Sequence, residues 1–149
     1  MRVNKGSLSN EQKTWMYKAV LRILLADKNI DASEMLTTRE ALAFLGMEIN
    51  LNTIMNLINN GEKHLQIYQV ELPYDAAFTI ASECISAGAI DTKLSPSEIK
   101  EIQNILKLLQ FSASGIDKLI EWGLQLSKSY NQGVVLKQHL AKHHKSKMV

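Results

Sequence analysis

The sequence contains two similar segments that lie 64 residues apart. The stretch "DKNIDASEM", which begins at Asp27, aligns with "DTKLSPSEI", which begins at Asp91. The correspondence continues downstream, where Leu42 falls on Leu106. A repeat of this length indicates two copies of one supersecondary unit, each with an apolar face that it cannot bury alone. We therefore expect two similar halves that pack face to face.

The chain has the periodicity and the start signals of α-helices, within these two segments and before them. Ser9 with Gln12, and Ser95 with Glu98, have the spacing of a capping box, and Pro96 stands at a first helical position. Apolar residues recur three and four positions apart after each box. Only seven Gly and two Pro interrupt the chain, which favours long helices over many short strands.

These patterns predict an all-α fold, a compact bundle of seven or eight helices built from two pseudo-symmetric helical repeats. No linker rich in Gly, Ser or Pro separates the halves, so we expect a single domain over residues 1–149. Repeat one covers about residues 10–60, repeat two about 75–127, and a basic C-terminal helix and tail cover 128–149. Helices are expected to start after Ser9, Asp31, Asn50, Pro73, Ser95 and Ser112 or Ser114, with a short helix (or a strand) over 63–70 and a last helix over 132–143.

Composition limits the class of protein. Hydrophobic residues make up 46% of the chain and charged residues 21%, so disorder over its whole length is not expected. The single cysteine, Cys84, cannot form an internal disulfide, which favours an intracellular, cytoplasmic location. Its apolar surroundings in the sequence predict a buried, inert thiol. No run of about 18 apolar residues is present, so no membrane-spanning helix is expected.

The residues "LLADKNIDASE" and "AIDTKLSPSE" resemble the TerB-like family of tellurite-resistance proteins. In both segments a helix ends in an acidic turn, and Ser-Glu then opens the next helix. The resemblance implies a duplicated helical domain over roughly residues 12–127, a role in the stress response, and no enzymatic activity. It also implies divalent metal binding at the acidic turns. Asp27-Lys28 and Asp91-Thr92 depart from the Asp-Gly that the family commonly has there.

The acidic turns permit two interpretations. Oxygen ligands for Ca²⁺ or Mg²⁺ could come from five side chains: Asp27, Asp31, Glu34, Asp91 and Glu98. Asp31 with Glu34, and Ser95 with Glu98, equally fit capping boxes, in which Ser replaces Asp without loss. Asp27 and Asp91 follow a helix, where its dipole disfavours a carboxylate, so capping does not explain them.

The C-terminal segment differs in charge from the rest of the chain. Residues 1–121 contain 12 Lys or Arg and 15 Asp or Glu, whereas residues 122–149 contain five Lys and no acid. Such a tail could dock on an acidic protein, an anionic membrane surface or nucleic acid. The tail has no Arg and little aromatic or apolar bulk, which disfavours nucleic acid and a membrane surface. A solvated tail that aids solubility is the simplest interpretation, and another protein is the expected partner. His139 and His143 share a helical face, but the lysines around them favour a solvated tail over a metal site.

Overall fold

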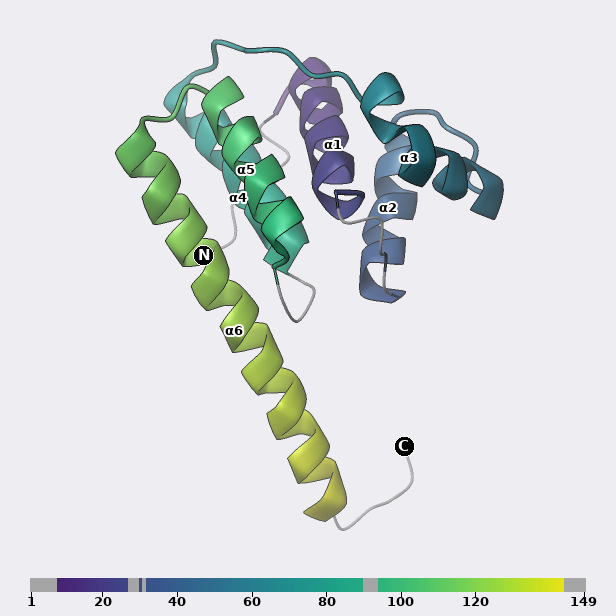
Figure 1. The fold of residues 1–149 in the computed structure, drawn as a ribbon, viewed down its shortest axis with the longest axis vertical. Coiled ribbons are helices and arrows are strands. Elements are labelled where there is room, and N and C mark those ends of the chain that lie inside the picture. The colour runs from purple at the N-terminus through teal and green to yellow at the C-terminus, as the bar shows by residue number, and fades with distance from the viewer. Residues whose placement is uncertain (1–7, 27–29, 31, 90–93, 144–149) are drawn as a thin grey trace.

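The computed structural model describes residues 8–26, 30, 32–89 and 94–143, and the chain is helical throughout these ranges except in its turns and one connection. The described residues form six helices (Figure 1). They are α1 (Asn10–Leu24), α2 (Ala32–Phe44), α3 (Leu51–His64), α4 (Tyr74–Ala89), α5 (Pro96–Leu108) and α6 (Ala113–His143).

Helix α1 lies between two groups of helices. It has α4 and α5 on one side and α2 and α3 on the other (Figure 1), and its most extensive contact is with α4. One hydrophobic cluster joins α1 with α4, α5 and α6. A second cluster joins Leu21 of α1 and Leu25, which follows α1, with α2, α3 and Leu65. Both cores therefore depend on side chains from the same helix.

The predicted start signals form the expected hydrogen bonds. The Ser9 hydroxyl accepts from the Gln12 N–H at 3.1 Å, and the Ser9 N–H donates to the Gln12 side chain at 2.9 Å. Ser95 and Glu98 form the same reciprocal pair at 3.1 and 3.0 Å. Asn50 caps α3 through the Thr53 N–H at 2.8 Å. These bonds satisfy backbone donors that the first turn of a helix leaves unpaired.

Helices α2 and α5 also end in the same way. Gly46 and Gln110, 64 residues apart, both have a left-handed backbone, with φ of 74° and 68°. In each turn the next residue donates back to the helix: Met47 to the Leu42 carbonyl at 2.9 Å, and Phe111 to the Leu106 carbonyl at 3.1 Å. This is the hydrogen-bond pattern of a Schellman C-cap.

The helix starts follow the 64-residue spacing in the first two helices of each half. Residues 32–44 of α2 correspond to residues 96–108 of α5, and α1 and α4 begin at Asn10 and Tyr74. The third helices differ. Helix α6 packs on α4 and α5, whereas α3 makes only small contacts with other helices in the described chain. The local structure of the halves is alike, but their packing is not equivalent.

The predicted number of seven or eight helices differs from the six described, for two reasons. Residues 65–73 are not helical, because partners elsewhere bind their backbone groups. Trp15 donates to the Tyr68 carbonyl at 3.0 Å, Val70 N–H donates to the Leu108 carbonyl at 3.1 Å, and the Gln110 side chain donates to the Val70 carbonyl at 2.8 Å. The expected separate helix over 132–143 is instead the continuation of α6, since no proline interrupts residues 113–143.

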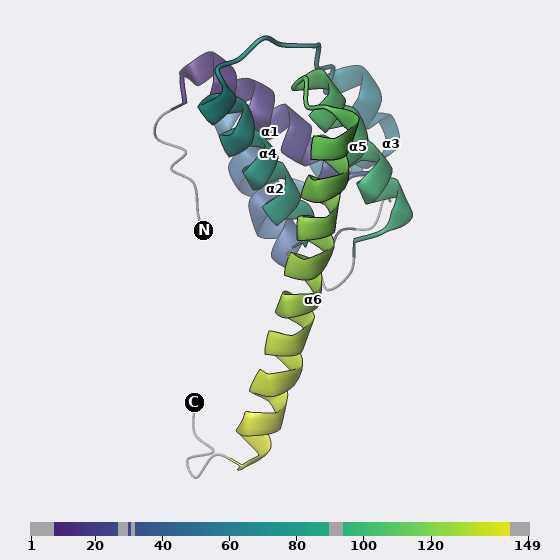
Figure 2. The same ribbon diagram turned by 90° about the vertical axis from the view of Figure 1, so that its left-hand side faces the viewer.

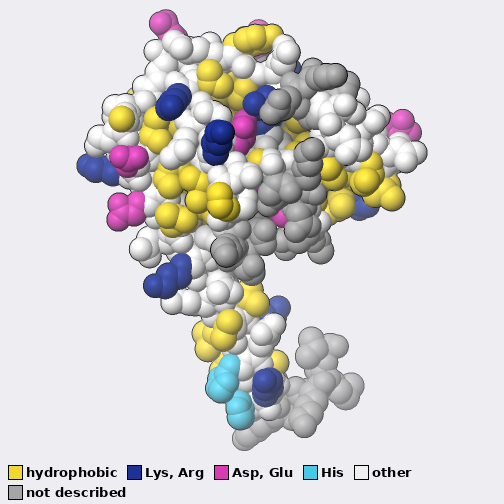
Figure 3. Space-filling view, viewed as in Figure 1, with side chains coloured by type: hydrophobic (Ala, Val, Ile, Leu, Met, Phe, Trp, Pro, Cys, Tyr) yellow, Lys and Arg dark blue, Asp and Glu magenta, His cyan; other side chains and the backbone are white. Residues whose placement is uncertain are grey.

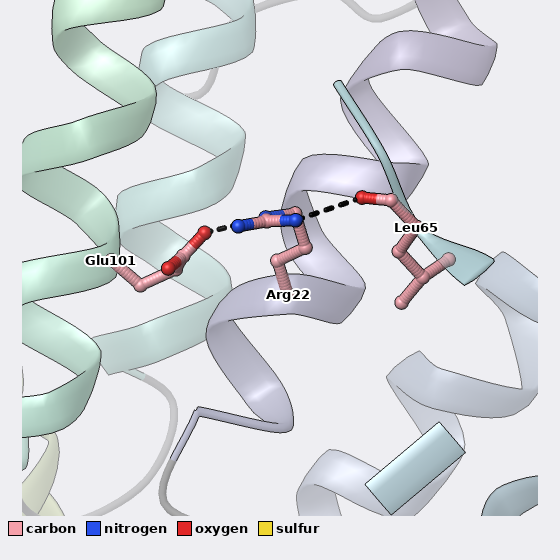
Figure 4. Close-up of polar contacts among 3 residues, drawn as sticks. All are labelled: Arg22, Leu65 and Glu101. Carbon is pink, nitrogen blue, oxygen red and sulfur yellow. Dashed lines mark hydrogen bonds and ion pairs between the residues drawn. The ribbon is translucent and has the colours of Figure 1, made fainter. Parts of the chain in front are cut away.

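A polar contact fastens the start of this connection to the body (Figure 4). The Arg22 guanidinium donates to Glu101 of α5 at 2.6 Å and to the Leu65 carbonyl at 3.0 Å. Both charged side chains are only about one-fifth exposed, at 21% and 16%. Arg22 thereby links α1, α5 and the end of α3.

Two glycines of α6 provide a matched test of this packing. A Cβ at position 123 would lie 2.9 Å from Ile85 Cγ2 of α4, whereas a Cβ at position 133 would have nothing within 4 Å. Alanine gains up to about 1 kcal/mol over glycine in a helix, but overpacking a core costs about 1–3 kcal/mol. We predict that Gly123→Ala lowers the free energy of unfolding, measured by urea denaturation. Gly133→Ala should increase helicity in circular dichroism without lowering stability, and equal stabilisation by both variants would contradict the close approach of α6 to α4.

Candidate functional site

Three of the five predicted metal ligands, Asp27, Asp31 and Asp91, lie outside the described residues. The other two, Glu34 and Glu98, occupy corresponding positions in the first turns of α2 and α5. Both are almost completely buried, each with 1% of its surface exposed. Among the residues that are described, no three His, Cys, Asp or Glu side chains gather in a way that could hold a metal ion.

Glu98 has a structural role at the start of α5. One carboxylate oxygen accepts from the Ser95 N–H, which closes the capping box described above. A carboxylate in the first helical turn also interacts favourably with the helix dipole. Capping therefore accounts for Glu98, and a cation site at the turns would have to draw on Asp27 and Asp91.

The C-terminal half of α6 is the most exposed helical surface in the described chain. From Lys128 to His143, which we call the arm, every side chain whose burial is described is exposed. Figures 1 and 2 both show the arm extending beyond the other five helices. At 1.5 Å per residue, these 16 positions extend for about 24 Å. Residues 113–127, by contrast, pack on the body through Ile116, Gly123 and Ser127.

Large apolar side chains lie on this exposed arm. Val134, Val135, Leu136 and Leu140 are 44%, 57%, 55% and 56% exposed. Lys128, Lys137 and Lys142 share the arm with them, and Figure 3 shows the yellow apolar and dark blue basic side chains intermixed there. The sequence predicted a basic helix in this region, but its periodicity did not indicate that the apolar residues would remain uncovered by the body.

Two imidazoles lie together near the end of the arm. The rings of His139 and His143 are 4.9 Å apart between centroids, with an interplanar angle of 57°. Both side chains are exposed, and they appear in cyan in Figure 3. The predicted shared face is therefore present.

A shallow groove of about 550 Å³ lies between the connection after α3 and the turn from α5 to α6. Residues 71–77 line one side and residues 109–112 the other. Tyr74 is 68% exposed at this groove. Its lining is partly polar and contains one carboxylate, Glu71, so it lacks the convergent polar groups that would indicate a particular reaction.

Cys84 lies in the core between the helices, as its sequence context predicted. It is fully buried in α4. Burial, followed by the nearby negative charge of Glu83, raises the pKa of the Cys84 thiol far above its ordinary value. The reactive thiolate is therefore scarce at neutral pH.

We predict that Cys84 in the folded protein resists alkylation by iodoacetamide at pH 8, because both access and ionisation are suppressed. The same thiol should react fully in guanidinium chloride. Mass spectrometry of the alkylated protein measures both states. Rapid alkylation of the native protein, under conditions where circular dichroism shows no unfolding, would contradict this account.

None of the helices in the described ranges combines the length with the apolar character that crossing a bilayer requires. Comparison with models of known protein families, with curated proteins and with solved structures found no match.

Proposed function

We propose that this protein is a non-enzymatic binding module, of the kind that the TerB-like resemblance implies, which docks on an acidic protein through the arm of α6. The exposure of four large apolar side chains on a basic helix that projects from the body carries this proposal. Exposed apolar surface of this kind is typical of interaction sites.

Charge favours an acidic partner. The arm contains Lys128, Lys137 and Lys142, and the sequence has no Asp or Glu after Glu121. Two arms placed against each other would bring only positive charges together, which disfavours pairing between arms of two copies. An acidic surface would attract the arm over distances up to about 8–10 Å at physiological salt.

The distribution of side chains around the helix favours a protein groove over a bilayer surface. Successive residues of an α-helix point about 100° apart, so Val134, Val135 and Leu136 point in three directions. By the same geometry Lys137 lies between Val134 and Leu140, and Lys142 lies beside Val135. A flat interface would have to bury a lysine in order to bury all four apolar side chains. A groove with acidic groups on its walls can accept both kinds of residue.

The packed half of α6 stabilises the exposed arm as a helix. An isolated helix of about 12–15 residues is marginal in water because nucleation is unfavourable. Residues 113–127 supply that nucleus by packing on α4 and α5, so the arm only has to propagate it. Complete burial of a Val or Leu side chain stabilises by about 1.5–3 kcal/mol. The four apolar side chains of the arm are about half exposed, so a partner that covers them would contribute about half of that free energy for each.

We predict that a photo-crosslinking amino acid at Leu140 captures a protein with an acidic binding surface. The matched control is Leu36, a leucine of the body that is 63% exposed against 56% for Leu140. The captured protein, once purified, should bind the wild-type chain with an affinity that falls as salt increases. Binding should be lost in the K137E/K142E variant.

Several results would contradict docking on an acidic protein. Capture of the same products from positions 140 and 36 would show that the arm is not selective. Crosslinks only to other copies of this chain would replace the acidic partner with self-association. Arm-dependent retention on heparin or anionic vesicles, with no protein captured, would assign the arm to nucleic acid or a lipid surface instead.

A second candidate function is divalent cation binding at the acidic turns of a duplicated helical unit. The 64-residue spacing of helix boundaries and of the turns at Gly46 and Gln110 supports this proposal. Asp27 and Asp91 would be its principal ligands, since capping already explains Glu98. Ca²⁺ and Mg²⁺ both prefer oxygen ligands of this type.

We predict that Ca²⁺ or Mg²⁺ raises the melting temperature and that the double variant Asp27→Ala and Asp91→Ala abolishes the increase. A ligand at 100 times its Kd stabilises a protein by about 2.7 kcal/mol, which corresponds to an increase of several degrees. The control is Asp75→Ala with Asp117→Ala, which removes two exposed carboxylates elsewhere. An equal response in the wild type and in both variants would exclude binding at the turns.

A further inference from the structure

We propose that His139 and His143 form a two-ligand site for a divalent transition metal ion, such as Zn²⁺, at the end of the arm. The two rings lie on one face of α6, one turn apart, with centroids separated by 4.9 Å. Both are exposed, so a metal ion can reach them without any rearrangement of the body. This inference does not rest on the docking role of the arm.

The spacing suits shared coordination of one ion. Two His at positions i and i+4 of a helix bind a single zinc in the zinc-protease motif, because that spacing places both imidazoles on the same face. Zinc–nitrogen bonds of about 2.0–2.1 Å in tetrahedral geometry place two ligand nitrogens about 3.3 Å apart. The observed ring separation and tilt of 57° require only side-chain rotation to reach this geometry, and exposed rotamers exchange within nanoseconds.

The chemistry of the pair differs from that of the acidic turns. Imidazole prefers Zn²⁺, Cu²⁺ and Ni²⁺, whereas Ca²⁺ and Mg²⁺ prefer oxygen. The pair supplies two ligands, so water or a carboxylate from another molecule would complete the coordination shell. Lys137 and Lys142 lie on the same stretch of helix and reduce the affinity for any cation. We therefore expect an exchangeable ion and not a permanently bound one.

A bound ion would connect two successive turns of the helix near its C-terminal end. Helix ends open more readily than helix interiors. An ion that binds only when both imidazoles face the same way stabilises the helical state of these turns by mass action. Metal binding and local helix stability are therefore coupled in the arm, and this coupling provides a specific readout.

The test uses the full chain with zinc chloride as the probe. Isothermal titration should detect one zinc ion per chain, and amide hydrogen exchange should slow in residues 136–143 when zinc is added. Removing only a residue that hydrogen-bonds to a metal ligand weakens metal binding by about 10–100-fold. Removing a ligand itself should cost at least as much, so His139→Ala and His143→Ala should each lower the zinc affinity at least about tenfold. His64→Ala should retain wild-type zinc affinity, and calcium chloride should not slow exchange in the arm.

Two outcomes would overturn the site. One is zinc affinity in the H139A/H143A variant equal to that of the wild type, which would place the ion elsewhere on the chain. The other is zinc binding without slower exchange in residues 136–143, which would show that the two imidazoles do not share an ion across a helical turn. Neither outcome depends on whether the arm binds a protein, so the two proposals can fail separately.

Discussion

The position of α1 between two hydrophobic cores is the constraint on which the rest of the structure depends. Leu21, Ile23 and Leu24 have no exposed surface, and in a helix Leu21 and Ile23 point about 160° apart, with Leu24 between them. Leu21 enters the cluster with α2 and α3, whereas Ile23 and Leu24 enter the cluster with α4, α5 and α6. One helix therefore supplies side chains to two cores. Without this shared helix, each core would be a small unit with marginal stability. A body made from short helices becomes cooperative because its two cores share this element.

Arg22 points from α1 in a direction between Leu21 and Ile23, and it makes a polar connection there. Its guanidinium bonds to Glu101 and to the Leu65 carbonyl (Figure 4), so a partly buried charge is compensated on both sides. A planar guanidinium presents its N–H donors in a fixed, forked arrangement, which the single ammonium nitrogen of a lysine in this position would not reproduce. The bond to Leu65 begins the series of contacts that directs residues 65–73 across the body. The non-helical connection is thus a consequence of how α1 and α5 pack.

The sequence predicted the helix ends, which are determined by interactions between neighbouring residues. Ser9, Asn50 and Ser95 begin helices, and Gly46 follows the end of one, because caps depend on hydrogen bonds between neighbouring residues. The connection over 65–73 could not be predicted, because its partners are Trp15, Leu108 and Gln110, which are distant along the chain. The exposure of Val135 and Leu140 could not be predicted either, because it also depends on which distant parts of the chain pack against them. Periodicity identifies an apolar face but does not tell which surface, if any, covers it.

The two halves share some local features and differ in how their third helices pack. Helices α2 and α5 have the same length and the same C-terminal turn, because each has to end at a corresponding point of its half. The third helices of the halves are free to differ, and α6 has become both a packing helix and a projecting one. Glu34 and Glu98 are buried at equivalent positions in the first turns of α2 and α5, and the capping box gives Glu98 a role in folding. The chemistry that folding does not require lies on α6 beyond Ser127: uncovered valines and leucines, lysines without acids, and two adjacent imidazoles. Because the body does not need this helix segment for its own core, the proposed binding roles rest on it.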